Sequence, residues 1–445
     1  MSERLESSSL FASIHRSLGR MDVVHEANRC LYCYDAPCTQ ACPTHIDVPA
    51  FIHKIRTGNL KGSARVIMEA NPAGASCARV CPTEELCEGA CVLNKEDVAI
   101  RIGDLQRYVT DWVREHDVEL FQPGPPTGFR VAVVGGGPAG LSAARELARM
   151  GHSVTIYEAK SRLGGLNTYG IVPFRLPEDV ALWEAEQVVK LGVTVHTDTA
   201  VGRDISPQEL LTRFDAVVLA FGMGAVPRLG IEGEELTGVW DAIELIERVK
   251  TGKSIGEIGS TVVVIGAGNT AVDAATCSKR LGAEQVTMVY RRTEKEMTAY
   301  EFEYDFAKQE GVEFRWLSAP TRILGEEGRV RGVEFIRMRL EAADDSGRPR
   351  PVPIPGSEYV VEADTVIRAI GQHRLTEVLQ GLGVECRDGV IQVDERFRTS
   401  NPKVFAAGDC TFEKGRGEAM VVEAAEQGKV AAWSLHQQWS HMQRV

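Results

Sequence analysis

Eight of the 11 cysteines in this sequence lie in two short runs. The runs are Cys30-x2-Cys33-x4-Cys38-x3-Cys42-Pro43 and Cys77-x3-Cys81-Pro82-x4-Cys87-x3-Cys91. Such spacings let several thiolates converge on one inorganic core, where soft sulfur ligands suit iron. Zinc modules usually carry paired C-x2-C knuckles, and only one C-x2-C occurs among these cysteines. The runs therefore predict two [4Fe–4S] clusters, with structural zinc or buried free thiols as the alternative interpretation.

A second chemistry is indicated by a strand that ends in a glycine-rich turn, G-x-G-x-x-G, before a helix. Gly135 allows the tight turn, Gly137 lets the backbone approach a pyrophosphate, and Gly140 permits close packing of helix against strand. Pro138 and Ala139 begin the helix, whose positive N-terminus attracts the phosphates. The pattern predicts a dinucleotide site.

The nucleotide at this first site is indicated by residues that follow the turn. Glu158 ends the next predicted strand, where its carboxylate can accept ribose hydroxyls, and Gly165 follows it. A Gly408-Asp409 pair occurs near the C-terminus. In flavoproteins that bind two dinucleotides, a late Gly-Asp pair returns to the first site and bonds the ribityl chain of FAD. This resemblance implies FAD, with a helix after Glu418 that aims its N-terminus at the flavin.

The same strand–turn–helix pattern occurs a second time. Its turn and helix start contain Gly266, Gly268, Asn269 and Thr270. The following strand ends in Arg291 and Arg292 rather than in an acid, which favours a 2′-phosphate and hence NADPH. Solvated arginines are the alternative, and related enzymes with such pairs use NADH. By resemblance, Gly371 closes this site near the nicotinamide.

The remaining cysteines, Cys277, Cys386 and Cys410, are far apart in the sequence. Flavoenzymes that reduce disulfides carry a close cysteine pair, which these positions do not form. We interpret each of the three as a buried thiol. Because the expected chemistry moves only hydride and electrons, no residue is assigned as a catalytic acid or base.

The segments between the motifs indicate the organisation of the chain. Amphipathic stretches at 48–70 and 102–113 predict helices around the cysteines, and a Pro/Gly linker follows at 121–128. Strands are expected at 130–134, 153–157, 261–265, 285–290, 365–370 and 404–407. Their alternation with helices predicts an α/β fold with parallel sheets, in which two Rossmann-like domains follow a helical domain. The expected boundaries are 1–122 for the iron–sulfur domain, 128–238 and 366–445 for the FAD domain, and 239–365 for the inserted NAD(P) domain.

Composition excludes several classes of function. The net charge of −12 argues against binding nucleic acid or an anionic membrane. No apolar run reaches the roughly 18–20 residues that a membrane helix needs. The first nine residues lack the pattern of a secretory signal, so the cytoplasm is the expected location.

The sequence resembles the NAD(P)H-accepting, FAD and iron–sulfur subunits of the dihydropyrimidine dehydrogenase and glutamate synthase family. The stretches that carry the resemblance are 26–33, 42–49, 102–108 and 169–177, with Met297–Tyr300 favouring the pyrimidine branch. The resemblance implies two interleaved ligand sets, Cys30, Cys33, Cys38 and Cys91 for one cluster and Cys42, Cys81, Cys87 and Gln106 for the other. Cys77 is then a spare thiol. Chemistry alone favours Cys77 over Gln106, because a thiolate is the stronger iron ligand.

The resemblance also implies a function. Electrons would pass from NADPH or NADH through FAD and the two clusters to a partner. The sequence ends at Val445, directly after the expected FAD-closing helix, which leaves no room for an FMN barrel. The expected partner is therefore a separate FMN subunit that reduces uracil or thymine to the dihydropyrimidine, within a heterotetramer. The alternatives are a subunit that supplies a glutamate-forming large chain, a ferredoxin–NAD(P) transhydrogenase subunit, and a redox scaffold without enzyme activity.

Overall fold

The structure is a computed structural model that describes residues 11–14, 17–95, 97–256, 258–343, 347–413 and 419–442. The expectations for the first nine residues and for Glu418 lie outside these ranges. The chain divides into two compact units, each of which is described by itself below. One unit contains residues 13–168, 175–223 and 374–445, and the other contains 224–373 with 169–174 and the N-terminal 1–12.

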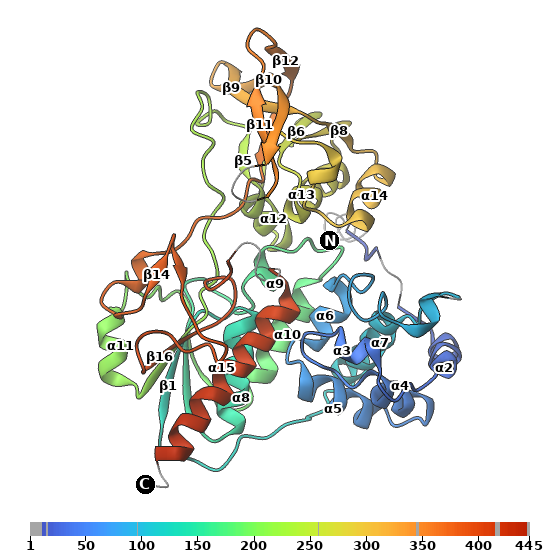
Figure 1. Ribbon diagram of the computed structural model, residues 1–445, viewed down its shortest axis with the longest axis vertical. Coiled ribbons are helices and arrows are strands. Elements are labelled where there is room, and N and C mark those ends of the chain that lie inside the picture. Colours follow the sequence, from blue (N-terminus) through green and yellow to red (C-terminus); the bar gives the residue numbers. More distant parts are fainter. Residues whose placement is uncertain are drawn as a thin grey trace. The chain divides into compact units, whose positions relative to one another are not determined.

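The cysteine-rich part of the first unit is helical (Figure 1). Its helices are α2 (Arg20–Arg29), α3 (Pro37–Gln40), α4 (Val48–Arg56), α5 (Leu60–Ala70), α6 (Gly74–Val80), η1 (Val92–Lys95) and α7 (Ile102–Glu115). The amphipathic stretch at 48–70 forms two helices, because the chain turns at Gly58 with φ of +74°. Asn59 then caps α5 by accepting a bond from the Gly62 amide at 2.9 Å. Fully buried Phe51 and Leu105 lie in the core between these helices.

A five-stranded parallel sheet forms the centre of the same unit, in the order β16-β4-β1-β2-β3. Its strands are β1 (Arg130–Val134), β2 (Ser153–Tyr157), β3 (Thr194–His196), β4 (Ala216–Leu219) and β16 (Val404–Ala406). Helices and smaller elements complete it, namely α8 (Pro138–Arg149), α9 (Leu166–Tyr169), α10 (Glu178–Val189), α11 (Pro207–Arg213), η3 (Glu377–Leu379), β14 (Cys386–Arg387), β15 (Val390–Ile391) and α15 (Val421–Met442). Strands β1 and β4 are buried on both faces, as parallel strands between helices must be.

Helix α15 lies along α8 over several turns (Figure 1). The approach is close because Gly428 lacks a side chain, and a Cβ there would lie 2.0 Å from the carbonyl oxygen of Ala139. Ser142 Oγ adds a hydrogen bond to Ala425 O at 2.5 Å. The first turn of α8, which follows the glycine-rich turn, is therefore covered by the N-terminal half of α15.

The second unit contains another parallel sheet, in the order β5-β13-β6-β7-β8. Its elements are β5 (Val239–Asp241), α12 (Ala242–Lys250), β6 (Thr261–Ile265), α13 (Asn269–Arg280), β7 (Gln285–Val289), η2 (Glu294–Glu296), α14 (Glu301–Gln309), β8 (Glu313–Arg315) and β13 (Thr365–Arg368). The predicted α/β class with parallel sheets is confirmed. The strands predicted at 130–134, 153–157 and 261–265 have the expected bounds.

The sequence analysis missed an antiparallel sheet in this unit. It consists of β9 (Ser318–Glu326), β10 (Arg329–Ala343), β11 (Pro349–Pro353) and β12 (Tyr359–Glu362), and β10 pairs with the other three. Charged and apolar residues alternate along β10, which is the period-two pattern of a half-buried strand. The strands of this sheet lie outside the glycine-rich motifs that predicted the parallel sheets. Among the described residues, no helix has the length and apolar content needed to cross a membrane.

Replacement of Gly428 by alanine tests the close contact between α15 and α8. We expect Gly428→Ala to lower the free energy of unfolding by about 1–3 kcal/mol, because the added methyl group overlaps the Ala139 carbonyl. Thermal unfolding of the variant measures the loss. Gln437→Ala, at an exposed position of the same helix, is the control and should unfold like the wild type. Equal stability of Gly428→Ala and wild type would contradict the packing.

Candidate functional site

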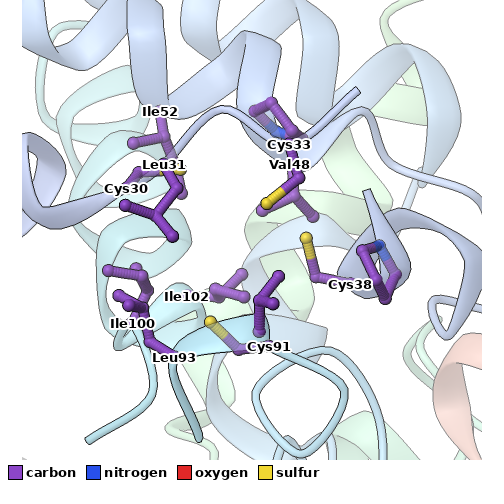
Figure 2. A pocket seen from close by; sticks show the side chains of 13 residues that line it. Cys30, Leu31, Cys33, Cys38, Val48, Ile52, Cys91, Leu93, Ile100 and Ile102 are labelled. Carbon is purple, nitrogen blue, oxygen red and sulfur yellow. The ribbon is translucent and has the colours of Figure 1, made fainter. Parts of the chain in front are cut away.

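One group of four thiols lines a single pocket in the helical part. Figure 2 shows the sulfur atoms of Cys33, Cys38 and Cys91 directed into this pocket, and Cys30 lies at its wall. Cys30 ends α2, Cys38 lies in α3, and Cys91 precedes η1. The two cysteine runs are therefore interleaved here, because Cys91 of the second run joins three thiols of the first.

The wall of this pocket is apolar. Leu31, Val48, Ile52, Ile100 and Ile102 are among its lining residues. Burial raises the pKa of the Cys30 thiol, and burial raises the pKa of Cys38 to about 11. A thiolate in such a setting is favoured only when a cation compensates its charge. The donor set, four thiols among apolar side chains, fits a soft iron–sulfur core.

A second pocket collects the other candidate ligands. Its lining residues include Cys42, Cys77, Cys81, Cys87 and Gln106. A hydrogen bond in which the Cys81 thiol donates to Cys77, together with burial, raises the pKa of Cys81 well above its usual value, and burial does the same for Cys87. Within the described ranges, no group of three or more His, Cys, Asp or Glu side chains is arranged to hold a single metal ion.

Gln106 is fixed within this second pocket. Its Nε2 donates to the carbonyl oxygen of Gly74 at 2.7 Å, and the residue is 7% exposed. Because the amide nitrogen is engaged, the atom left to act as a ligand is Oε1. Cys77 is 3% exposed and packs with Ala73, Val422 and Ala425. Both candidates for the fourth ligand therefore lie at the pocket.

Helix α6, which carries Cys77 and is followed directly by Cys81, is held by a side chain of α10. Glu184 of α10 accepts hydrogen bonds from the amides of Ala75 and Ser76 at 2.7 and 3.1 Å, and from Ser76 Oγ. No side chain within α6 caps its N-terminus, so Glu184 satisfies these amides instead. Burial raises the pKa of Glu184 to about 7.

The first glycine-rich turn has the backbone that a dinucleotide requires. Gly135 has φ of +101°, and a Cβ there would lie 2.4 Å from Ala220 O. A Cβ on Gly140 would lie 2.0 Å from Gly135 O, so α8 can approach the strand only with glycine at this position. A Cβ on Gly165 would lie 2.8 Å from the Cα of Gly137. The two backbone segments can therefore approach each other this closely only because Gly165 has no side chain. This cradle, which side chains would fill, fits the pyrophosphate of FAD.

The other predicted FAD residues gather around this turn. Glu158 is buried, and its carboxylate accepts from the amides of Gly136 and Lys160 at 2.7 and 2.8 Å. A Cβ on Gly408 would lie 2.9 Å from the Cβ of Ala139, so the late Gly-Asp pair does return to the first turn of α8. Pro138 stands at the first helical position. Burial raises the pKa of Asp409, against the opposing effect of Arg374.

The second turn repeats this geometry in the other unit. Gly266 has φ of +140°, and a Cβ there would lie 2.2 Å from Ala369 O. Near Gly268, the segment that follows η2 covers the turn, because Thr298 N donates to Ala267 O at 3.1 Å. Asn269 Oδ1 accepts from the Tyr300 amide at 3.1 Å. Thr270 is exposed at the start of α13.

The structure separates the two arginines at the end of β7. Arg291 is exposed, whereas Arg292 is 3% exposed and its Nε donates to Pro349 O at 2.8 Å. Burial of Arg292 within the antiparallel sheet was not foreseen from the sequence. Gly371 has φ of +106°, and a Cβ there would have no neighbouring atom within 4 Å.

One expectation about the other cysteines is wrong. Cys277 and Cys410 are buried, but Cys386 is exposed. It lies in β14, which pairs with β15 alone in a two-stranded hairpin too small to cover a side chain. The sequence analysis also passed over Glu184, Lys429 and Val422, because single residues on amphipathic helices carry no signal of long-range contacts.

Two family models match the sequence. Residues 129–428 match the model described as pyridine nucleotide-disulphide oxidoreductase. Residues 7–118 match the model described as dihydropyrimidine dehydrogenase domain II, 4Fe-4S cluster. The chain belongs to the pyridine nucleotide-disulphide oxidoreductase family. It is therefore an NAD(P)H-dependent flavin oxidoreductase that uses FAD and carries a 4Fe-4S domain, as the sequence predicted.

Relatives of this oxidoreductase support the predicted resemblance. The chain is 36% identical to the NAD-dependent dihydropyrimidine dehydrogenase subunit PreT of Escherichia coli, over 93% of each chain. It is 35% identical to the glutamate synthase [NADPH] small chain of the same organism, over 95% of this chain and 92% of the relative. It is 37% identical to the NADP(+)-dependent formate dehydrogenase subunit beta of Moorella thermoacetica, over 90% of this chain. The chain spans only 60% of that subunit's length.

The fold of this oxidoreductase is also found in solved structures. Thioredoxin reductase of T. acidophilum matches 70% of this chain and 99% of its own, with a TM-score of 0.55 and 24% sequence identity. At this identity the match concerns the fold alone.

The raised pKa of Glu184 predicts a pH-dependent stability. The folded chain keeps the carboxyl protonated up to pH about 7, whereas the unfolded chain ionises near 4.5. The contribution of Glu184 to the free energy of unfolding therefore falls between these pH values, by about 3 kcal/mol, and is constant above them. In Glu184→Gln this fall should be absent.

Anaerobic unfolding of both proteins in urea between pH 5 and 8 measures the difference. Glu186→Gln is the matched control, because Glu186 lies on the same helix with 62% of its side chain exposed. The control should follow the wild-type profile. Parallel profiles of the wild type and Glu184→Gln would refute the prediction.

Proposed function

We propose that this oxidoreductase is the electron-input subunit of a dihydropyrimidine dehydrogenase. It would take hydride from NADPH or NADH at FAD and deliver electrons, through two [4Fe–4S] clusters, to an FMN-containing partner that reduces uracil or thymine. When bound, FAD would supply a group that can accept a hydride and release its electrons singly, and each cluster would supply a one-electron acceptor. Every other contribution would come from the chain's own residues, which position the sites.

One observation carries the proposal: helix α15 contacts both the residues proposed to bind FAD, here called the FAD turn, and the second thiol pocket. Val422 of α15 lines the pocket that contains Cys42, Cys81 and Cys87. One turn and a half further along, Gln427 accepts a hydrogen bond from the amide of Gly408 at 2.8 Å. Residues proposed to hold FAD and residues proposed to hold iron therefore contact the same helix, at positions about one and a half turns apart.

The proposed ligand sets follow the two pockets. Cys30, Cys33, Cys38 and Cys91 would hold one cluster, and Cys42, Cys81, Cys87 and Gln106 would hold the other. The engaged amide nitrogen of Gln106 supports its role as an oxygen ligand. Cys77 then contributes apolar packing against α15.

The proposed domains are an iron–sulfur domain at 1–122, an FAD domain at 128–238 and 366–445, and an NAD(P) domain at 239–365. Within the last, exposed Arg291 is the residue available to a 2′-phosphate, since Arg292 is engaged with Pro349. The partner would be a pyrimidine-reducing subunit in a heterotetramer. The 36% identity to the PreT subunit over 93% of each chain supports this choice of partner.

Two variants separate the candidates for the fourth ligand. We expect Cys77→Ser to keep the full iron and acid-labile sulfide content of the wild type. Gln106→Ala should lose a large part of both, because one cluster lacks a ligand. Iron and sulfide analysis of anaerobically purified protein measures both contents. Loss of half the iron in Cys77→Ser, with Gln106→Ala unaffected, would reverse the assignment.

The function is tested by reconstitution with the partner. The chain alone should oxidise NAD(P)H with an artificial electron acceptor and should not reduce uracil. Addition of the FMN subunit purified from the same cell should give uracil- or thymine-dependent oxidation of NAD(P)H. The decisive measurement is the mass spectrum of the native complex, together with this assay. Uracil reduction by the chain alone, or a native partner that forms glutamate, would contradict the proposal.

A further inference from the structure

The residues that follow Cys42 form a tight turn. The sequence is Cys42-Pro43-Thr44-His45, and His45 N donates to Cys42 O at 2.8 Å. Proline suits the second position of such a turn because its ring fixes φ. The turn folds the Thr44 side chain back toward the residue that begins it.

Within this turn, the Thr44 hydroxyl contacts the sulfur of Cys42. Thr44 Oγ1 lies 3.3 Å from Cys42 Sγ, and Thr44 is 1% exposed. A buried hydroxyl without a partner costs free energy, and the sulfur provides one here. When Cys42 is a metal-bound thiolate it carries no proton, so the hydroxyl must be the donor.

Helix α15 holds this turn in place. Lys429 Nζ lies 3.4 Å from Thr44 O and 2.8 Å from Ala70 O, and Lys429 is 5% exposed. Its charge is paired with Glu426 at 2.5 Å. The backbone of Thr44 is therefore fixed by a side chain from the same helix that contacts the FAD turn.

The chain contains a second Cys-Pro-Thr sequence that lacks the sulfur contact. In Cys81-Pro82-Thr83, the Thr83 amide donates to Cys81 O at 2.9 Å. The Thr83 hydroxyl lies 3.4 Å from Glu84 Oε2 instead of bonding the cysteine sulfur. Cys81 and Cys42 line the same pocket, so Cys42 has a threonine hydroxyl within hydrogen-bonding distance of its sulfur, whereas the matched threonine after Cys81 contacts Glu84.

We propose that Thr44 is a positioning residue that sets the reduction potential of the iron–sulfur cluster bound through Cys42. The inference rests on the proposed function, because it requires Cys42 to be a cluster ligand. One-electron reduction adds negative charge that is shared by the ligand sulfurs. A hydroxyl that donates to such a sulfur bonds the reduced form more strongly than the oxidised form, and so raises the potential. The effect favours electron entry at the pocket that Val422 of α15 lines.

The test compares the potentials of variants that differ by one hydroxyl. Thr44→Val removes the hydroxyl and keeps the shape of the side chain. At a fixed potential we expect the ratio of reduced to oxidised cluster to fall by about 3- to 10-fold, where tenfold is 59 mV for one electron. Anaerobic titration with dithionite, followed by electron paramagnetic resonance of the complete chain, measures the midpoint. The other cluster is the internal reference and should not shift.

Three further variants make the outcome specific. Thr44→Ser keeps the hydroxyl and should restore the wild-type potential, whereas Thr44→Ala should shift it as valine does and serves if valine does not fit. Thr83→Val, in the matched tripeptide, should leave the potential unchanged. A wild-type potential in Thr44→Val and Thr44→Ala with full iron would overturn this inference and leave the proposed function intact. A wild-type chain without iron and acid-labile sulfide would overturn the proposed function as well.

Discussion

The close packing of α15 against the first turn of α8 constrains the whole cofactor-binding unit. Gly428 permits it, because any side chain at that position would overlap the Ala139 carbonyl. With the helix in this position, Gln427 meets the Gly408 amide and Val422 reaches the second thiol pocket. A shift of α15 would disturb both contacts together, since a helix moves as a rigid rod. The arrangement of FAD turn and thiols thus depends on one backbone contact.

Polar side chains then join the sheet-containing part of this unit to its helical part. Glu184 caps the amides that begin α6, Lys429 binds carbonyls at Thr44 and Ala70, and Arg145 binds the carbonyls of Met68 and Glu69. Each of these charged groups is buried, and each satisfies backbone atoms that helix ends and turns leave without partners. Such contacts specify orientation more strictly than apolar packing, because a hydrogen bond requires both a distance and an angle.

The thiol pockets differ from these polar contacts, because their sulfur atoms lie beside apolar side chains. The wall of the first pocket is apolar, and burial raises the pKa of Cys30 and Cys38 there and of Cys87 in the second pocket. The chain alone therefore holds these sulfurs in a form that resists ionisation. A bound cationic core reverses this preference by compensating the charge of the thiolates, which links cluster binding to the stability of the helical part. At the second pocket, helix packing places the Gln106 amide in the lining, and a local turn places the Thr44 hydroxyl against the Cys42 sulfur.

The sequence by itself determined the two dinucleotide turns, the strands that lead into them and the class of both cofactor sites. Those features depend on local backbone geometry, since Gly135 and Gly266 must adopt positive φ and a buried parallel strand must be continuously apolar. The two short runs of cysteines were also visible in the sequence, because their members are close together along the chain. The grouping of Cys91 with the first run was already implied by the resemblance. The tertiary structure alone decided that Arg292 is buried while Arg291 is exposed, and that Cys386 is exposed. It alone showed that Glu184 and Lys429 reach the cysteine-rich helices. These outcomes depend on which surfaces meet after folding, and a single side chain on an amphipathic helix carries no record of its distant partner.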